Sequence, residues 1–376
     1  MLTIAALASA LCIVAVWGLY PALIGSIAAM RRRGASADAA LSRDQLPRVT
    51  AVVATRADPA SVRDRVADLL RSEYPAELLD VIVAYDARTT EPVATWGAAE
   101  GASRVRIVRG DEPGGKAAAL NAGMRAATGE VVVFGDSGQR FGADAIPLLV
   151  ASVSRDGVGA ASGRLELSSG ANAPSLPLRL YWSLERWLRR REAEVHSAIG
   201  VTGAIYAMRR ALWTALPAGL ILDDLYVPMR LILDGHRVDF VDAARAYETR
   251  ATTDSNEYRR KVRTLTGVWQ LCAWLPETLV PVRNPVWPQF VAHKVLRLLT
   301  PYWLLVCVAW AVVAVEREMG LLWFALAIAA FAAMLQLRSR PVNMLRSALV
   351  SSVLIQVATV RATANGALKR WDVWHA

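Results

Sequence analysis

Two aspartates each follow a short apolar run of the sequence. Asp86 comes after "VIVAY", and Asp136 comes after "VVVFG". β-branched residues favour a buried strand, and ligands of open parallel sheets bind at the carboxyl ends of the strands. A carboxylate there can accept a hydrogen bond from a sugar or a base, or hold a divalent cation. Each aspartate could equally cap the turn or helix that follows it.

An adjacent pair of acids, Asp223 and Asp224, stands farther along the chain. The pair follows the letters "LIL" and precedes a segment whose apolar residues recur at helical spacing. One acid at a helix N-terminus is worth about 0.3–1 kcal/mol as a cap. Two adjacent acids exceed what a cap requires, and acid pairs are one way in which a site obtains a base. We therefore expect a general base in this pair.

A lysine and an asparagine lie in the glycine-led segment "GGKAAALNAG" (114–123). The backbone N–H groups of such a helix start, together with Lys116, could bind a phosphate. The spacing does not match that of a Walker P-loop. Asn121 could line the same site or serve as a packing polar residue.

A basic cluster, "YRRKVR" (258–263), opens a later helical segment and includes Arg260 and Arg263. Guanidinium groups bind diphosphate oxygens well. The alternative is a run of charges that faces solvent or lipid head groups.

The elements that would position these residues alternate between strand and helix from about residue 47 to 165. Strand-like runs at 48–55, 78–86, 104–110 and 130–136 are separated by amphipathic stretches. Such alternation predicts an α/β fold with a mostly parallel sheet covered by helices on both faces.

The N-terminal end of the chain is apolar. Residues 2–29 carry no charge and are followed by three arginines at 31–33. About 20 apolar residues suffice to cross a bilayer, whereas a signal peptide carries its basic residues before the apolar core. A spanning anchor is favoured over a buried core helix, and the positive-inside rule then puts the following domain in the cytoplasm.

The C-terminal end is also apolar. Segments 300–315 and 320–337 are separated by only four residues and fit two antiparallel spans. A third segment, 344–360, could cross the membrane, lie in its interface or re-enter it.

The overall composition agrees with a membrane protein. Hydrophobic residues make up 54% of the chain, mean hydropathy is +0.30, and the net charge is +10. This positive charge suits a protein surface that lies against anionic lipid. The sequence contains no nucleic-acid recognition motif. Three cysteines show neither metal-ligand spacing nor a disulfide framework.

The order of these motifs resembles the family 2 glycosyltransferases, in particular the membrane-embedded branch related to hyaluronan, chitin and cellulose synthases. The succession is an anchor, a strand ending in Asp86, "GKAAALNAG", "FGDSG", "TGAIYAMRR", "LDDLYVPMRL", "EYRRKVR" and apolar spans. The resemblance covers nearly the whole chain. It implies a GT-A-type fold and an inverting, metal-dependent hexosyltransferase with a nucleotide-sugar donor, usually a UDP-sugar, and Mg²⁺ or Mn²⁺.

The same resemblance implies roles for individual residues. Asp136 corresponds to the first acid of a D-x-D motif, which reaches the metal and the diphosphate, and Asp224, beside Asp223, to the general base. Thr202 and Gly203 correspond to a segment under the acceptor. The residues implied for the donor nucleotide site are Asp86, Lys116, Asn121, Asp136, Arg260 and Arg263.

Two departures from the family pattern bear on the product. The D-x-D position reads Asp136-Ser137-Gly138, without the second acid, and the Q-x-x-R-W position lacks both glutamine and tryptophan. One carboxylate still suffices for Mg²⁺ when diphosphate oxygens and waters complete the shell. Single transfer to a lipid-linked or membrane-proximal acceptor then competes with processive polysaccharide synthesis and export, for which a homo-oligomer could build the channel. A catalytically degenerate nucleotide-sugar-binding scaffold is the non-enzymatic alternative.

The expected organisation has four parts in an integral protein of the bacterial inner membrane, with its catalytic domain in the cytoplasm. These parts are an anchor at 1–33, a catalytic domain at 45–275, an interfacial junction at 276–299 and C-terminal transmembrane or interfacial helices at 300–366. The expected partners are a nucleotide-sugar donor, a lipid or saccharide acceptor and membrane lipids, and nucleic acid is not among them.

Overall fold

The computed structural model describes residues 1–31, 42–90, 102–166, 176–248, 254–337 and 339–373. Within these ranges, eight strands form one sheet in the order β3-β2-β1-β4-β7-β6-β8-β5. The strands are β1 Val49–Thr55, β2 Leu79–Tyr85, β3 Val105–Arg109, β4 Val131–Phe134, β5 Gln139–Phe141, β6 Val158–Glu166, β7 Tyr206–Arg209 and β8 Arg237–Glu248. Strands β3, β2, β1 and β4 are parallel, as are β6 and β8, whereas β7 and β5 are antiparallel to their neighbours.

Near-continuous runs of apolar residues in β1, β2 and β4 explain why the centre of this sheet is buried on both faces, since successive side chains point to opposite faces. Val52 and Ile82 face one core together with α4 (Lys116–Ala126), while Val53 and Val81 face the other. The second core also holds α3 (Pro59–Leu70) and α5 (Ala145–Val153). The α/β fold with a mostly parallel sheet between helices is therefore confirmed.

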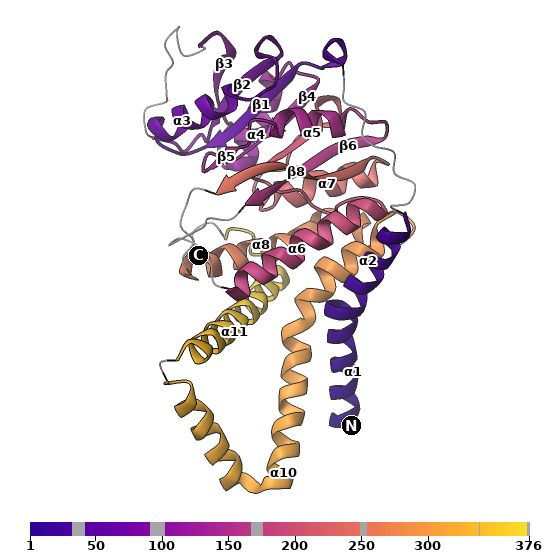
Figure 1. Ribbon diagram of the computed structural model, residues 1–376, viewed down its shortest axis with the longest axis vertical. Coiled ribbons are helices and arrows are strands. Elements are labelled where there is room, and N and C mark those ends of the chain that lie inside the picture. Colours follow the sequence, from indigo (N-terminus) through magenta and orange to yellow (C-terminus); the bar gives the residue numbers. More distant parts are fainter. Residues whose placement is uncertain (32–41, 91–101, 167–175, 249–253, 338, 374–376) are drawn as a thin grey trace.

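Three further helices lie on the side of the sheet that faces the apolar ends of the chain. They are α6 (Leu176–Val195), α7 (Asp223–Leu233) and α8 (Asp254–Trp274). Figure 1 shows α6 and α8 between the sheet above and the long apolar helices below.

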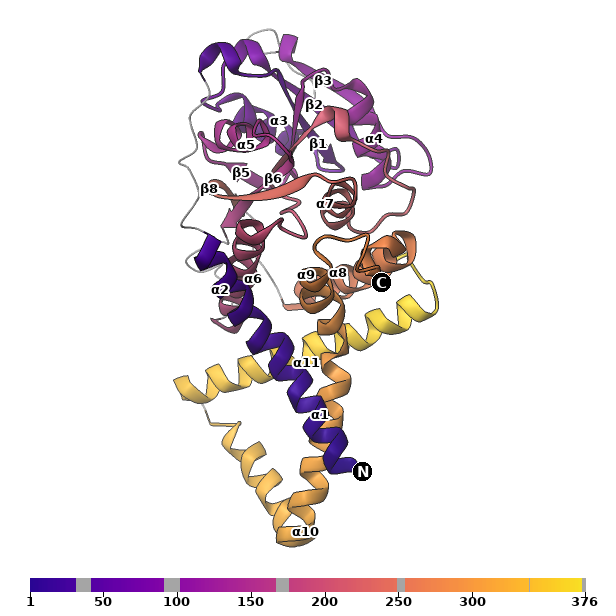
Figure 2. The same ribbon diagram turned by 90° about the vertical axis from the view of Figure 1, so that its right-hand side faces the viewer.

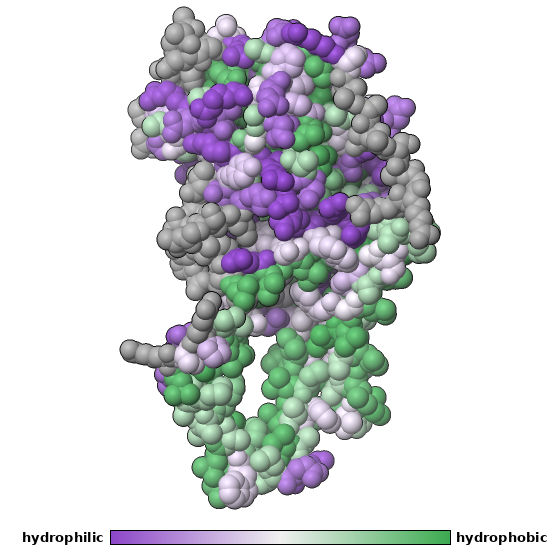
Figure 3. Space-filling model, viewed as in Figure 1, coloured by the Kyte–Doolittle hydropathy of each residue, from purple (hydrophilic) through white to green (hydrophobic). Residues whose placement is uncertain are grey.

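The apolar ends of the chain form these long helices. At the N-terminus, α1 (Leu2–Val14) and α2 (Tyr20–Arg31) are joined through a π-helical turn at Ala15–Leu19. At the C-terminus, the short α9 (Trp287–Phe290) leads into α10 (Thr300–Met334), and α11 (Arg340–Ala367) follows. Figure 3 shows hydrophobic residues gathered on these helices and hydrophilic ones on the domain above.

Three helical segments of the described chain are long and apolar enough to cross a membrane: Leu2–Arg31, Trp287–Gly320 and Pro341–Ala367. The expected turn between two spans is a break at Gly320, whose φ of 77° is a left-handed value that favours glycine. The returning arm, Leu322–Met334, is shorter than a usual span. Figure 2 shows α11 running across the base of the domain rather than along α1, although its sequence would suffice to span.

Candidate active site

A cavity of about 1150 Å³ lies between the sheet and the apolar helices. One end of the cavity is formed by the carboxyl ends of β1, β2 and β4 and by the start of α4, with Asp86, Lys116, Asp136 and Asp223 in its wall. We call it the donor end, after the nucleotide-sugar donor that the sequence leads us to expect there. The membrane end of the cavity is formed by α6, α10, α11 and the turns beside them, with Trp17, Arg297, Thr300, Ile355 and Thr359 in its wall. Of the described residues, twelve arginines and lysines and seven carboxylates line the cavity, and this excess of positive charge favours anionic ligands.

Asp86 is fixed at the donor end by the glycine loop before α4. It follows β2 and is 3% exposed, and its Oδ1 accepts a hydrogen bond from the Gly115 N–H at 2.8 Å. Gly114 has φ +86°, and a Cβ there would lie 2.4 Å from the same Oδ1. Burial disfavours the ionised carboxylate, but hydrogen bonds from Arg88 and Gly115 outweigh burial and lower the pKa of Asp86. Asp86 therefore orders this loop as an anion.

Lys116 joins two of the predicted acids. Its Nζ lies 3.2 Å from Asp136 Oδ1 and 3.2 Å from Asp223 Oδ2. Burial disfavours the charged ammonium, but the charges of Asp136 and Asp223 outweigh burial and raise the pKa of Lys116. The Asp136 side chain remains 44% exposed in the cavity, so a ligand can reach it.

The two adjacent acids of α7 have different environments. Asp223 is paired with Lys116, whereas burial and the neighbouring charge of Asp223 raise the pKa of Asp224. Gly203 lies directly under Asp224, and a Cβ at residue 203 would lie 3.3 Å from Asp224 Oδ2. An ionised carboxylate with a raised pKa is a better proton acceptor, as the base expected in this acid pair would need to be.

Arg189 of α6 lines the cavity, although its sequence does not single it out. Its Nη1 donates to Thr202 Oγ1 at 3.3 Å, and the Thr202 N–H donates to Ser162 Oγ at 2.8 Å. The arginine belongs to "LERWLRRREAEV", which looks like the solvated face of an amphipathic helix. The one hint of a binding role in the sequence is that several arginines lie close to a tryptophan in this stretch.

Nor does the sequence single out Tyr206 of β7. Its ring is fully buried and stacks on Phe134 with centroids 4.6 Å apart. Its hydroxyl has no hydrogen-bond partner among the described residues. Burial, then the charges of Asp223, Asp224 and Asp136, raise the pKa of this phenol well above its ordinary value, which places it beside the acids.

Three residues of the basic cluster of α8 line the cavity. Arg260, Lys261 and Arg263 are all in its wall, and the Arg260 guanidinium lies 4.8 Å from the centre of the Trp182 ring. Burial lowers the pKa of Arg263, and the Asp224 carboxylate opposes that shift, so this guanidinium is close enough to influence the expected base.

Asn121 requires a correction. Its Nδ2 donates to the Leu216 carbonyl at 2.9 Å, and its Oδ1 accepts from the Leu216 N–H at 2.8 Å. Both ends of the amide are thus occupied by one backbone position, and Asn121 does not line the cavity. The expected donor contact is wrong, and the packing alternative describes this residue. The other predicted site residues share the cavity wall: Asp86, Lys116, Asp136, Thr202, Gly203, Asp223, Asp224, Arg260 and Arg263.

The side chains that could act as metal ligands decide what kind of metal site could form. Within the described ranges, no group of three or more histidine, cysteine or acidic residues could hold a metal ion alone. Asp136 offers one accessible carboxylate. Mg²⁺ often takes only one or two carboxylates and completes its shell with phosphate oxygens and waters, so Asp136 fits a cation that arrives with a diphosphate.

Comparison with known proteins identifies the family. Residues 47–267, more than half of the chain, match the family model described as "Glycosyltransferase like family 2". The chain belongs to this glycosyltransferase family. No curated protein matches its sequence.

Solved structures extend the comparison. A mannosyltransferase from Pyrobaculum calidifontis, in complex with GDP-Man and Mn²⁺, aligns with a TM-score of 0.68 and 22% identity over 98% of this chain and 100% of its own. A glucosyl-3-phosphoglycerate synthase from Mycobacterium tuberculosis, in complex with Mn²⁺, uridine diphosphate and glucosyl-3-phosphoglycerate, aligns over 66% of this chain and 83% of its own, with a TM-score of 0.41 and 16% identity. The first match confirms the fold class, including its terminal helices. These matches do not distinguish the hyaluronan, chitin and cellulose synthase branch.

Proposed function

We propose that this protein is an inverting hexosyltransferase that moves a sugar from a nucleotide-diphosphate donor to a hydroxyl of a membrane-proximal acceptor. The observation that carries this proposal is the convergence of Asp136, Lys116 and Asp224 on one cavity that continues to the apolar helices. A metal-binding acid, a phosphate-binding cation and a base are the groups that such a transfer needs.

The donor end supplies the groups for the nucleotide and its diphosphate. Asp86 would contact the nucleoside, and Asp136 is the residue that would hold Mg²⁺ or Mn²⁺. When bound there, the cation would supply positive charge to the diphosphate oxygens. Arg260 and Arg263 of α8, which line the same cavity, would add positive charge for the leaving group. The mannosyltransferase complex with GDP-Man and Mn²⁺ supports a nucleotide-sugar of this kind, and we propose a UDP-sugar as the first candidate.

The two acids of α7 would have different roles in the transfer step. Asp224 takes the proton of the acceptor hydroxyl while the hydroxyl oxygen bonds to the anomeric carbon. The bond from that carbon to the phosphate oxygen breaks, and the nucleoside diphosphate leaves. Asp223 holds Lys116 in place, and its charge keeps Asp224 basic. Thr202 and Gly203 would form the floor beneath the acceptor.

The membrane end supports a lipid-linked acceptor. Thr300 of α10 and Thr359 of α11 line the same cavity as the acids, and both helices belong to segments apolar enough to cross a membrane. We propose residues 1–33 as the anchor, 45–275 as a catalytic domain on the cytoplasmic side of a bacterial inner membrane, 276–299 as the junction and 300–366 as membrane-associated helices.

A screen of nucleotide-sugars tests this function. The purified protein in neutral detergent is heated with each UDP- and GDP-sugar and with Mn²⁺, because a ligand that binds the folded state raises the melting temperature. We expect one donor to stabilise the protein in a way that chelation of the metal abolishes. That donor, radiolabelled, is then supplied with membrane lipids. A single-sugar glycolipid supports the proposal, a long polymer favours the synthase alternative, and binding with neither transfer nor hydrolysis favours the scaffold.

A further inference from the structure

The membrane end of the cavity contains a buried guanidinium group whose hydrogen-bonding capacity is only partly used. The Arg297 side chain is 9% exposed, and its Nη1 donates to Glu185 Oε2 at 3.1 Å. Its Nε and Nη2 are buried and have no hydrogen-bond partner among the described residues. The Trp17 ring covers one face of the guanidinium, 4.3 Å away. Buried charged donors without partners are rare, and an absent ion or ligand is one explanation for them.

The surroundings of Arg297 carry more cations than anions. Glu185 Oε1 also lies 2.8 Å from Lys294 Nζ and 3.8 Å from Arg189 Nε. His293 lies between Glu185 and Glu192, with its ring nitrogens 2.9 and 2.7 Å from their oxygens. The hydroxyl of Tyr20 also donates to Glu192. Among the residues that the structure describes, three permanent cations thus face two carboxylates here, and an anion would balance the excess.

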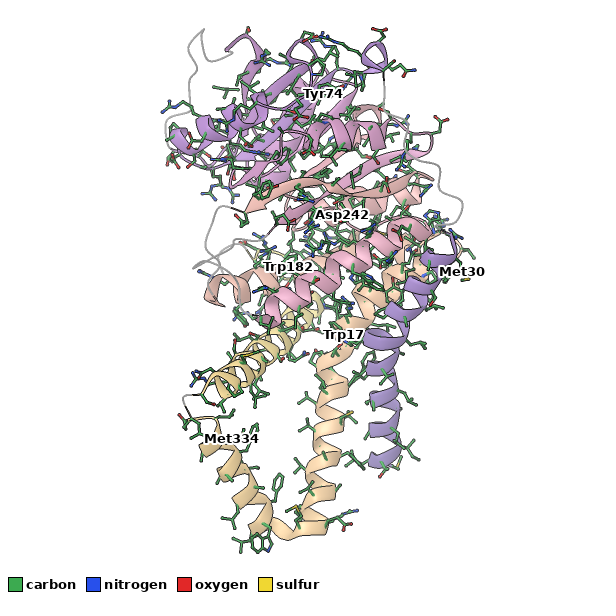
Figure 4. All side chains as sticks on the ribbon, in the orientation of Figure 1. Trp17, Met30, Tyr74, Trp182, Asp242 and Met334 are labelled. Carbon is green, nitrogen blue, oxygen red and sulfur yellow. The ribbon has the colours of Figure 1, made fainter. Side chains whose placement is uncertain are left out.

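The position of this cationic cluster, Arg189, Lys294 and Arg297, determines how an anion would reach it. Trp17, Ile355 and Gln356 line the cavity beside the cluster and belong to helical segments that are apolar enough to cross a membrane. Figure 4 shows Trp17 where these helices meet the domain, beneath α6. Basic pockets at such a junction bind the head groups of anionic lipids.

The cationic cluster is connected to the expected base by direct contacts. Arg189 contacts Glu185 on one side and donates to Thr202 on the other. Gly203, the next residue, lies under Asp224. A head group held by the cluster would therefore extend toward Asp224 along the cavity floor.

We infer that the acceptor is a phosphate-bearing membrane lipid whose phosphate is bound by Arg297, Lys294 and Arg189 and whose head-group hydroxyl reaches Asp224. This inference rests on the proposed transfer reaction and names its acceptor class. The head-group oxygen bonds to the anomeric carbon, its proton goes to Asp224, and the nucleoside diphosphate departs. The lipid phosphate only anchors the acceptor and takes part in no bond change.

Melting of the full-length protein in neutral detergent tests the site with three probes: dihexanoyl phosphatidylglycerol, dihexanoylglycerol and inorganic phosphate. We expect the phosphatidylglycerol to raise the melting temperature and the other two to have little effect at equal concentration. Equal stabilisation by inorganic phosphate would mean that the site binds the free anion. Equal stabilisation by dihexanoylglycerol would mean that the site does not recognise the phosphate group. Either result overturns the inference.

Two variants connect the effect to the cluster. Arg297→Gln is expected to raise the phosphatidylglycerol concentration for half-maximal stabilisation by at least about tenfold, since it removes charge-assisted hydrogen bonds. Lys294→Gln, whose side chain is more exposed, is expected to act in the same direction and serves if Arg297→Gln does not fold. Arg317→Gln, at an exposed position of α10 away from the cavity, is the matched control.

Thermal stabilisation by the nucleotide-sugar distinguishes a failure of the lipid-acceptor inference from a failure of the proposed transfer reaction. Wild-type protein that responds to the nucleotide-sugar but not to phosphatidylglycerol contradicts this inference and leaves the proposed function standing. Protein that responds to no nucleotide-sugar contradicts the proposed function itself. An unchanged lipid response in both the Arg297→Gln and Lys294→Gln proteins would place the lipid elsewhere.

Discussion

The two ends of the cavity hold charge in opposite ways. At the donor end, one cation, Lys116, is shared by the carboxylates of Asp136 and Asp223. At the membrane end, one carboxylate, Glu185, is shared by three cations, which are Arg189, Lys294 and Arg297. The first arrangement leaves carboxylate oxygen for a metal ion, whereas the second leaves cationic groups for an anion that arrives without a metal. If both proposals hold, one cavity binds two phosphorylated molecules by different means, one through a metal ion and one through cationic side chains.

The largest expected effect on the transfer rate comes from replacing Asp224, the proposed base, which lies between the two ends of the cavity. Asp224→Asn should lower the transfer rate at least about a hundredfold, the low end of what a general base contributes. Since folding raises the pKa of Asp224, its ionised form costs stability at a pH above that raised pKa. The variant should therefore melt no lower than wild type at about pH 8. Asp234→Asn, at an exposed position just after the C-terminal end of the same helix, is the control. A rate close to wild type would remove Asp224 from the chemistry.

A smaller effect is expected from the metal-binding acid of the donor end. Asp136→Asn should raise the Mn²⁺ concentration for half-maximal activity by at least about tenfold, because a charge-assisted contact is lost. Arg297→Gln should leave this concentration unchanged, since its site is proposed to need no metal. A metal titration of both variants measures this difference, and equal shifts would break the comparison between the ends.

The pH dependence should report the pairing of the two acids on α7. The transfer rate should fall as the pH is lowered through the pKa of Asp224, because the base must be ionised. Burial and the charge of Asp223 raise that pKa, so the fall should occur above the pKa of about 3.9 of an ordinary aspartate. Asp223→Asn removes the like charge and should move the fall to lower pH. The pH–rate profile of each protein measures this, and a fall that stays in place would show that Asp223 does not set the basicity of Asp224.

The smallest effect on activity is expected at Asn121. Asn121→Ala leaves the Leu216 backbone without its two side-chain hydrogen bonds, so it should lower the free energy of unfolding by about 1–2 kcal/mol. Stabilisation by the nucleotide should be unaffected, since the side chain lies outside the cavity wall. Asn343→Ala, at an exposed position of α11, is the control for thermal melting. A large loss of nucleotide binding would restore the donor contact expected from the sequence.

The sequence predicted the donor end better than the membrane end for a physical reason. Asp86 and Asp136 directly follow apolar strands, and parallel strands bring their carboxyl ends to one edge of a sheet. The strand pattern alone therefore indicates that the two acids are close. The same local pattern, of alternating strands and helices, was sufficient to predict the α/β fold.

Long-range contacts were beyond this kind of prediction. Asn121 bonds to Leu216, 95 residues away, and nothing near Asn121 in the sequence indicates that partner. Glu185 and Arg297 are separated by 112 residues, and each belongs to a stretch that resembles an ordinary charged helix surface. The course of α11 was left open by its composition, since packing on α6 and α8, rather than hydropathy, accompanies its path across the domain.

The anomeric configuration of the transferred sugar tests the central claim most directly. If Asp224 delivers the acceptor oxygen from the side opposite a diphosphate held at Asp136, one displacement occurs and the configuration is inverted. Proton NMR of the product formed from a donor of known configuration measures this. The account predicts a product of opposite anomeric configuration to the donor. A product that retains the configuration of the donor would contradict it.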